Sequence, residues 1–353
     1  MLPALRRNFA TAVRYHAQGA PAQVLKYVSS FSCSSLVVED VGLLPKTLGQ
    51  HEVAVKFLAA PVNPADLSMV TGGYGIKAAL PAIGGNEGVA QVTAIGQAVS
   101  SLKVGDRVIP AVAGFGTWRT EAVAKEDELL AVPSSIPVEY AATLAVNPCT
   151  AYRLLADFAK LGKDDVVIQN GANSAVGQAV IQLAALRGIK TINIIREDQH
   201  YADTVENLKG LGATIVCPDH YLGTADFKRL IADLPAPKVA FNCVGGDNGL
   251  QITKVLGKNG VAVTYGGMAR EPVMTSTTAL VFNNISLRGF WMTEWAKHAP
   301  VEERKAMLKE LADLMAAGKL RSWVETYPFS DFENALDKVV NRLTKRKVVL
   351  LME

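Results

Sequence analysis

Hydrophobic and polar residues alternate along the first part of the chain, in short runs separated by glycine and proline. Residues 51–62 alternate and then become apolar, and residues 87–96 alternate as well. Apolar residues at every second position are typical of strands with one buried face, while Gly and Pro mark the turns between strands. The pattern therefore predicts a β-rich domain over residues 13–145.

From about Pro148 the pattern changes to short apolar strands that alternate with helical segments. Residues 164–170 contain the first predicted strand, and residues 176–188 form a helix that ends at Gly188. Short buried strands separated by helices imply a parallel sheet that is covered on both faces. Residues 146–293 are therefore predicted to form a doubly wound α/β domain.

Two amphipathic helices are predicted near the C-terminus. Residues 300–320 carry apolar side chains at helical spacing, and Ser330 and Glu333 have the spacing of a capping box at the start of the second helix. Between the two helices, residues 321–329 are predicted to form a strand that need not belong to the parallel sheet.

Composition limits the classes of protein to be considered. A chain of 353 residues predicts two domains of ordinary size, and 49% hydrophobic residues are enough for a sizeable core. The net charge of +3 is too small to indicate a nucleic-acid or membrane-surface partner, and no apolar run is long enough to cross a bilayer. The four cysteines form no CxxC pair, which predicts reduced and mostly buried thiols.

The first residues have the composition of an organellar targeting sequence. Residues 1–12 include Arg6 and Arg7, and the first acidic residue of the chain is Glu39. Arginine without acidic residues, and without a long apolar centre, is typical of a transit peptide rather than a secretory signal. We expect residues 1–12 to be such a peptide, with a frayed basic terminus as the alternative.

A dinucleotide-binding turn is predicted between the first strand and the first helix of the α/β domain. The sequence Gly171–Gly177, "GANSAVG", departs from Gly-x-Gly-x-x-Gly at Ala172 and Ser174, and keeps Gly177. Small residues also occur in ordinary strand–helix turns, so this motif gains its weight from the strand before it and the long helix after it. Backbone N–H groups at such a turn favour a bound phosphate.

The end of the next strand bears on the choice of nicotinamide cofactor. Arg196 follows the strand, with Glu197 and Asp198 directly after it. An acidic residue at this position would bind a ribose hydroxyl, whereas arginine matches the geometry of a 2′-phosphate. NADPH is therefore predicted over NADH, although the two acids would repel a phosphate unless they point away from it.

With these features in place, the chain resembles the medium-chain dehydrogenase/reductase superfamily from about Val13 to the C-terminus. Within it, the mitochondrial trans-2-enoyl-thioester reductases are the most similar group, because many of their motifs occur here in order. The matching segments are "APVNPADLSMVTGGYG", "PAIGGNEGVAQV", "GTWRTEAV", "VNPCTAYRLL", "VIQNGANSAVGQAVIQLAA", "FNCVGG", "VTYGGMA" and "LRGFW".

This resemblance implies a GroES-like β-rich catalytic domain, formed by residues 13–145 and 294–353, with a Rossmann domain of residues 146–293 inserted between them. It implies NADPH-dependent reduction of trans-2-enoyl thioesters, carried on acyl carrier protein or CoA, in mitochondrial fatty acid synthesis in the matrix. It also implies a homodimer in which the strands of residues 285–291 pair with each other.

No metal site is expected. Asn86 stands where the superfamily's alcohol dehydrogenases have a zinc-binding histidine, and the cysteine-rich lobe for structural zinc is missing. Catalytic zinc requires three protein ligands of the Cys, His or carboxylate type, and asparagine is a poor substitute.

Tyr74 is the candidate catalytic residue. A neutral phenol can donate a hydrogen bond to the thioester oxygen as negative charge develops there, because its pKa is about 10. The "GGYG" context matches the tyrosine that is the proton donor in the resembling family. A partly exposed loop tyrosine without catalytic function is the alternative. Whether Tyr74 transfers the proton or only polarises the oxygen is left open.

The resemblance also implies a set of cofactor-binding residues. For Asn147 the structural alternative is a capping asparagine, and for residues 290–293 it is an edge strand. For Lys347 it is a solvated run of charged residues. The set comprises Asn147, Asn173, Ser174, Ala175, Val176, Arg196, Glu197, Asp198, Tyr265, Gly266, Gly267, Met268, Phe290, Trp291, Met292, Thr293 and Lys347.

Two other functions share some of these features. An NADPH quinone or alkenal reductase would have the same cofactor turn, and Tyr74 in its glycine-rich context is what distinguishes the enoyl reductase from it. A non-catalytic binding protein is the alternative from another class, and the intact turn with Arg196 argues against it. The preferred carrier and the acyl chain length do not follow from the sequence.

Overall fold

The computed structural model describes residues 10–29, 47–341 and 346–352. Residues 1–9 of the predicted transit peptide lie outside this range, as does Cys33. Strand β1 (Thr11–Tyr15) includes the last two residues of that predicted peptide, and Ala12 and Val13 in it are fully buried. The other three cysteines are free thiols in buried positions.

The chain forms two compact units. Unit 1 comprises residues up to Ala145, Leu308–Ala316 and Trp323 onward, and unit 2 comprises Val146–Met307 and Ala317–Ser322. Unit 2 thus extends beyond residue 293 and includes α10 (Met292–His298). Helix α10 is fixed to α4 (Asn147–Leu154), because the guanidinium of Arg153 lies 4.4 Å from the ring centroid of Trp295.

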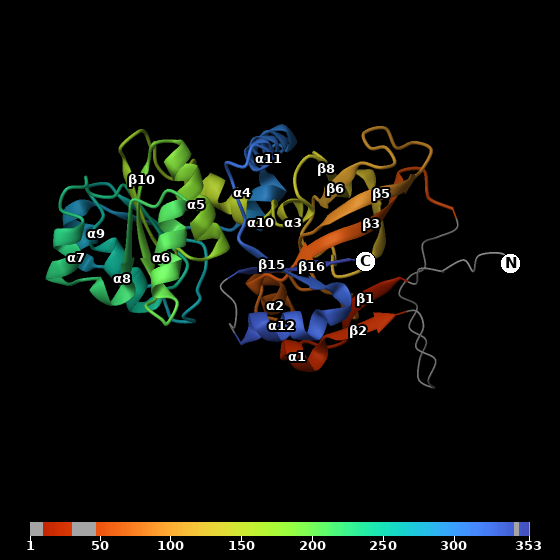
Figure 1. The fold of residues 1–353 in the computed structure, drawn as a ribbon, viewed down its shortest axis with the longest axis horizontal. Helices are drawn as coiled ribbons and strands as arrows, with labels where there is room; N and C mark the ends of the chain where they lie inside the picture. Colours follow the sequence, from red (N-terminus) through yellow and green to blue (C-terminus); the bar gives the residue numbers. More distant parts are fainter. Residues whose placement is uncertain (1–9, 30–46, 342–345, 353) are drawn as a thin grey trace. The chain divides into compact units, whose positions relative to one another are not determined.

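Unit 2 is built on a six-stranded parallel sheet with the order β11-β10-β9-β12-β13-β14, and helices surround its strands (Figure 1). The strands are β9 (Val166–Asn170), β10 (Lys190–Ile195), β11 (Ile215–Pro218), β12 (Val239–Asn242), β13 (Val261–Thr264) and β14 (Ser286–Gly289). The helices between them are α5 (Ala175–Leu186), α6 (Tyr201–Gly210), η2 (Asp219–Tyr221), α7 (Ala225–Leu230), α8 (Gly246–Thr253) and α9 (Thr277–Asn283).

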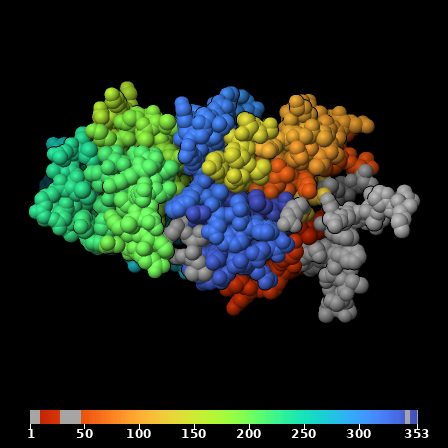
Figure 2. Space-filling view, viewed as in Figure 1, coloured from red at the N-terminus to blue at the C-terminus, as the bar shows by residue number. Residues whose placement is uncertain are grey.

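The central strands of this sheet are buried on both faces, as their unbroken apolar runs predict. Val166, Val167 and Ile168 of β9 are each 0% exposed, and Phe241 of β12 is also fully buried. A strand covered by helices on both sides cannot alternate between polar and apolar residues. Helix α6, in light green, lies at the surface of this unit (Figure 2).

Unit 1 contains a seven-stranded sheet with the order β15-β16-β3-β5-β6-β8, and β7 also pairs with β3. Its strands are β3 (Glu52–Pro61), β5 (Val89–Ile95), β6 (Arg107–Pro110), β7 (Glu121–Lys125), β8 (Leu129–Val132), β15 (Val324–Pro328) and β16 (Lys347–Leu351). Strand β16 pairs antiparallel with β3, so the C-terminal residues complete a sheet that the N-terminal part begins.

A smaller three-stranded sheet with the order β2-β1-β4 accompanies it. Its remaining strands are β2 (Lys26–Ser29) and β4 (Ala82–Ile83). The helices of this part are α1 (Pro21–Val24), α2 (Pro64–Val70), η1 (Glu126–Glu128), α3 (Val138–Ala142), η3 (Phe329–Asp331) and α12 (Phe332–Val340), and α11 (Val301–Ala316) precedes β15. The predicted fold class, a GroES-like domain with a Rossmann domain, is confirmed.

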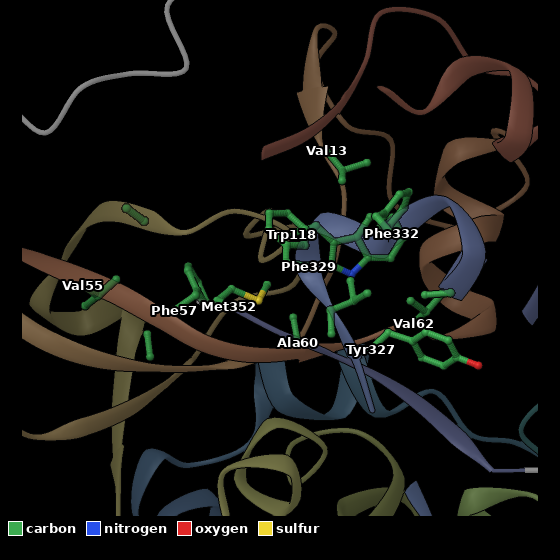
Figure 3. Packing of buried hydrophobic residues seen from close by; sticks show 14 of the residues in the cluster. Val13, Val55, Phe57, Ala60, Val62, Trp118, Tyr327, Phe329, Phe332 and Met352 are labelled. Carbon is green, nitrogen blue, oxygen red and sulfur yellow. The ribbon is translucent and has the colours of Figure 1, made fainter. Parts of the chain in front are cut away.

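The core of unit 1 is centred on aromatic side chains from distant parts of the sequence (Figure 3). Trp118 is 0% exposed, and its ring centroid lies 5.2 Å from that of Phe332. Its indole Nε1 donates a hydrogen bond of 3.0 Å to the carbonyl oxygen of Pro61. This packing fixes the end of β3, from which α2 and the loop with Tyr74 continue.

Within the part of the chain that the structure describes, every helix is too short or too polar to cross a membrane.

Candidate active site

Helix α2 begins at a buried carboxylate. Asp66 is 1% exposed, and its Oδ2 accepts a hydrogen bond of 2.7 Å from the backbone N–H of Asn63, which immediately precedes the helix. Pro64 occupies the first turn, where its missing N–H costs no helical hydrogen bond. The sequence "NPAD" thus forms the start of a helix.

Asn86 lies against this helix start. Its backbone N–H and its side-chain Nδ2 both donate to Oδ1 of Asp66, at 2.9 and 2.6 Å, and its Oδ1 accepts from the backbone N–H of Gly114 at 2.8 Å. The residue at the zinc-histidine position therefore links three segments of unit 1 by hydrogen bonds. Among the described residues, no group of three or more His, Cys, Asp or Glu side chains is arranged to hold a metal ion.

Lys347 extends the same network from the C-terminal strand. Its ammonium donates a hydrogen bond of 2.6 Å to Oδ1 of Asn63, whose Nδ2 donates at 2.8 Å to Oε1 of the buried Glu87. Burial lowers the pKa of Lys347, although Glu87 and Asp66 oppose that shift. Lys347 is therefore part of a structured polar network and not of a solvated charge run.

Burial also raises the pKa of Asp66, to about 6. The hydrogen bonds from Asn63 and Asn86 and the charge of Lys347 act in the opposite direction, and they do not outweigh the desolvation. This carboxyl group therefore changes its charge close to neutral pH.

Tyr74 follows directly on the C-terminal end of α2. The backbone N–H groups of Gly73 and Tyr74 both donate to the carbonyl oxygen of Ser68, at 2.8 and 3.1 Å. Gly72 adopts a φ of +79°, a left-handed conformation that glycine permits, and its carbonyl oxygen accepts a hydrogen bond from the ammonium of Lys77. The main chain of Tyr74 is therefore held on the helix, while its side chain is half-buried.

The predicted phosphate turn joins β9 to α5 in unit 2. Ser174 is the N-cap of the helix, and its hydroxyl accepts a hydrogen bond of 3.1 Å from the N–H of Gly177. A Cβ atom at Gly177 would lie only 2.5 Å from the carbonyl oxygen of Ala172, so only glycine fits. The retained third glycine thus allows close packing of helix and strand, and the other N–H groups of the first turn have no acceptor within the helix.

Polar residues at the carboxyl ends of the strands hold the neighbouring loops in place. Asn170 at the end of β9 donates from Nδ2 to Oδ1 of Asn242 at 2.8 Å, and its Oδ1 accepts from the N–H of Cys243 at 2.8 Å. The N–H of Gly245 also donates to Asn242, at 3.0 Å. Sequence analysis did not single out Asn170 and Asn242. An asparagine that ends an otherwise apolar strand is the signal that could have found them.

Two buried polar atoms near this edge of the sheet lack a partner among the described residues: Nδ2 of Asn147 and the hydroxyl of Tyr265. The thiol of Cys243 and the hydroxyl of Ser174 lie close enough to act on the pKa of Tyr265, which burial raises well above its usual value, but neither makes a hydrogen bond of good geometry with it. Buried polar groups are normally satisfied, so these two atoms fit a site for a polar ligand.

The other predicted cofactor residues of unit 2 lie at the surface or line a depression. Gly267 and Met268 are exposed, and Gly266 is partly buried with the position of its absent Cβ 3.3 Å from Cys243. Phe290 lies edge-on to Phe158 with 5.8 Å between ring centroids. The depression measures about 560 Å³ and is lined by Asp157, Phe158, Thr264, Gly289, Phe290, Trp291, Glu294 and Trp295. Next to it, Met292 is buried and Thr293 is half-buried.

Arg196, Glu197 and Asp198 are exposed beyond the end of β10. Glu197 lies near His220, with 3.4 Å between its Oε2 and Nδ1 of the imidazole. Oδ1 of Asp198 accepts a hydrogen bond of 2.9 Å from the N–H of His200. Both acids thus have local partners beside the arginine.

A doubly wound nucleotide-binding unit together with a GroES-like unit defines the class of medium-chain dehydrogenases and reductases. Two family models match accordingly: the alcohol dehydrogenase GroES-like domain over residues 49–134, and the zinc-binding dehydrogenase over residues 175–313. The first match falls in unit 1 and most of the second in unit 2.

Within this class, similarity to known proteins extends over the whole chain. The mitochondrial enoyl-[acyl-carrier-protein] reductase of Homo sapiens is 44% identical, over 100% of this chain and 95% of its own. The Dictyostelium discoideum protein of the same name is 41% identical, over 98% of each chain. The chain therefore belongs to the mitochondrial enoyl-[acyl-carrier-protein] reductase family, which confirms the resemblance seen in the sequence.

Solved structures agree with this placement. The Etr1p/NADP/crotonyl-CoA complex has a TM-score of 0.86 and 32% sequence identity, and the match covers 97% of this chain and 99% of that one. A putative NADPH:quinone reductase from Bacillus thuringiensis has a TM-score of 0.83 at 26% identity, with the same coverage. Both classes of enzyme therefore share the fold, and sequence identity is higher for the thioester reductase.

Proposed function

We propose that this protein is a mitochondrial reductase that uses NADPH to convert trans-2-enoyl thioesters into saturated acyl thioesters in fatty acid synthesis. The observation that carries this function is the 41–44% identity to mitochondrial enoyl-[acyl-carrier-protein] reductases over 98–100% of the chain. NADPH is the cofactor, and it supplies the hydride that reduces the β-carbon of the substrate. The residues present fit this cofactor, since Gly177 and the Ser174 cap form a phosphate-binding turn.

The chain's own residues then have two tasks in the reaction. The first is to hold the cofactor, for which we assign the turn of Asn173–Val176, Arg196, and the unpartnered amide of Asn147. The remaining proposed contacts are residues 265–268 and 290–293, which follow β13 and β14. Lys347 is included because its ammonium has two further N–H donors besides the one bonded to Asn63.

The second task is to stabilise the negative charge that develops on the thioester oxygen. We assign it to the hydroxyl of Tyr74, which donates a hydrogen bond to that oxygen. A fixed donor is effective in such a reaction because it needs no reorganisation as the charge develops. The two hydrogen bonds from the backbone N–H groups of residues 73 and 74 to Ser68 fix the main chain that carries this side chain.

Substrate choice tests the function directly. With NADPH, the purified protein is expected to saturate a short trans-2-enoyl-CoA and a trans-2-enoyl group on acyl carrier protein, and to leave quinones almost unreduced. The rate of NADPH oxidation measures all three reactions. Faster turnover of a quinone than of either thioester would contradict the proposal and favour the quinone reductase alternative.

We further propose a homodimer formed through β14. This strand ends the six-stranded sheet, and all four of its residues are exposed. Exposed apolar side chains occur in this strand and in α9, which precedes it in the chain. Leu287 of β14 is 45% exposed, and Val281 and Phe282 of α9 are 66% and 73% exposed. An open sheet edge beside exposed apolar residues is a surface that normally pairs with another chain. Among the solved structures, one similar protein is described as an Etr1p/Etr2p heterodimer from Candida tropicalis.

Charge placed on this surface is expected to separate the subunits. The double substitution Val281→Lys and Leu287→Lys should change the mass in solution from two chains to one chain of 37.6 kDa, measured by analytical ultracentrifugation. Val104→Lys, at a 59% exposed valine in unit 1, is the control and should leave the mass unchanged. A dimer that survives the double substitution would place the interface elsewhere.

A further inference from the structure

The end of β10 presents an electrostatic conflict for a protein that uses NADPH. Arg196 stands where an arginine accommodates the 2′-phosphate of the adenosine ribose, but two carboxylates follow it directly. The negative charges of these carboxylates would repel a phosphate bound by Arg196 and weaken its binding. The conflict is resolved only if something in the structure occupies or neutralises Glu197 and Asp198.

The carboxylate of Asp198 accepts a hydrogen bond within its own loop. Its Oδ1 accepts a hydrogen bond of 2.9 Å from the backbone N–H of His200, in the turn that leads into α6. An aspartate that bonds to a backbone N–H two residues later is a common stabiliser of such turns. This carboxylate is therefore directed toward the loop.

Glu197 is paired with a histidine from η2, the turn that follows the neighbouring strand β11. In the parallel register of β10 and β11, Ile195 lies opposite Pro218. Glu197 comes two positions after Ile195, and His220 comes two positions after Pro218. The Oε2 of Glu197 and Nδ1 of His220 are 3.4 Å apart. The imidazole lies edge-on to the ring of Tyr221, with 5.0 Å between centroids. Strand register thus brings the two side chains together.

We propose that His220 is a specificity residue for NADPH, which acts by neutralising Glu197. When it is protonated, His220 balances the negative charge of this carboxylate, so that Arg196 meets the 2′-phosphate without a competing acid. The inference depends on the proposed role of Arg196 at the ribose. It predicts that the preference for NADPH over NADH varies with the charge of His220.

The surroundings of His220 set the direction of this pH dependence. Glu197 faces it from the end of β10, and Asp219 and Tyr221 belong to its own turn. Tyr201 of α6 lies near Glu197 and Tyr221 and stays neutral, because burial raises its pKa. A histidine side chain is charged only when it is protonated, which lower pH favours. His220 should therefore strengthen NADPH binding more at pH 6.5 than at pH 8.0.

Equilibrium binding tests the inference independently of catalysis. Calorimetry gives the dissociation constants of NADPH and NADH for the wild type, His220→Gln, Glu197→Gln and the double variant. At pH 6.5, His220→Gln should weaken NADPH about two- to fivefold, the range expected for an exposed charge pair, with a smaller effect at pH 8.0. NADH lacks the phosphate and should bind equally to all four proteins. In the Glu197→Gln background, His220→Gln should have no effect.

Controls separate this inference from the cofactor site on which it depends. His298→Gln removes another exposed His–Glu pair of unit 2, with 2.7 Å between His298 Nε2 and Glu294 Oε1, and should leave both affinities unchanged. Equal weakening of NADPH and NADH by His220→Gln, or an effect that persists without Glu197, would overturn the role of His220. If Arg196→Gln also fails to weaken NADPH, the assignment of the phosphate site is overturned as well, while enoyl reduction is judged by the substrate assay.

Discussion

Tyr74→Phe is expected to lower kcat for a trans-2-enoyl-CoA by about 100- to 1,000-fold, the usual cost of removing one donor to a developing oxyanion. The substitution deletes a single hydroxyl from a side chain that is half-buried and whose main chain is held by Ser68. The loop should therefore keep its conformation, and NADPH affinity should barely change. Steady-state kinetics combined with NADPH titration measures both quantities.

The comparison needs a tyrosine without a catalytic assignment. Tyr27 in β2 belongs to the same unit and is 37% exposed, so Tyr27→Phe should retain kcat. A Tyr74→Phe enzyme with wild-type activity would remove this residue from the mechanism. The solvent isotope effect on kcat adds a second test. If the phenol transfers the proton itself, the variant should lose the solvent isotope effect on kcat that the wild type shows, and if it only polarises the oxygen, the effect should remain.

The Rossmann half of the molecule could be predicted from sequence because its signals are local. Apolar runs such as residues 166–168 in β9 follow from burial on both faces, and the change to helical spacing marks α5. The degenerate phosphate turn could be recognised because a strand precedes it and a long helix follows it, and Gly177 is the glycine that it keeps. The structure gives the reason, since its missing Cβ lets helix and strand pack closely while Ala172 and Ser174 need no such space.

The polar network of unit 1 could not be predicted in the same way. Asn63, Asn86 and Lys347 are separated by up to 284 positions, and their hydrogen bonds depend on how β3, α2 and β16 come together. Local patterns carry no sign of the contact of Asp66 with Asn86, which lie 20 positions apart. The extension of unit 2 beyond residue 293 was missed for a similar reason, because the contact of Arg153 with Trp295 is tertiary.

A buried carboxyl group with a raised pKa has a consequence for stability that can be measured. In the unfolded chain Asp66 has the ordinary pKa of 3.8, and in the folded protein burial raises it to about 6. The folded state therefore binds the proton more tightly, so stability from this group is fully present below pH 3.8 and is lost as the pH rises through 6. The difference of roughly two pKa units corresponds to about 3 kcal/mol of unfolding free energy.

Asp66→Asn isolates this effect in the pH dependence of stability, because an amide does not titrate. The hydrogen bonds from Asn63 and Asn86 to Asp66 all come from N–H donors, so the amide nitrogen of the variant loses at least one of them, at a cost that does not depend on pH. Between pH 4 and pH 7 the unfolding free energy of the variant should therefore rise by about 3 kcal/mol relative to that of the wild type. Urea unfolding at several pH values between 4 and 7.5 measures the difference. Asp127→Asn, at an exposed carboxylate of the same unit, should give a curve parallel to that of the wild type.

A difference between wild type and Asp66→Asn that stays constant across this pH range would show that Asp66 keeps the same charge throughout, and would contradict the raised pKa. The expected gain in stability also bears on function, because a natural sequence that retains a destabilising charge normally does so for activity. Asp66 sits at the start of the helix that ends just before Tyr74, and its charge helps to hold Lys347 as an ammonium. The Asp66→Asn variant should therefore be less active than the wild type at pH 7.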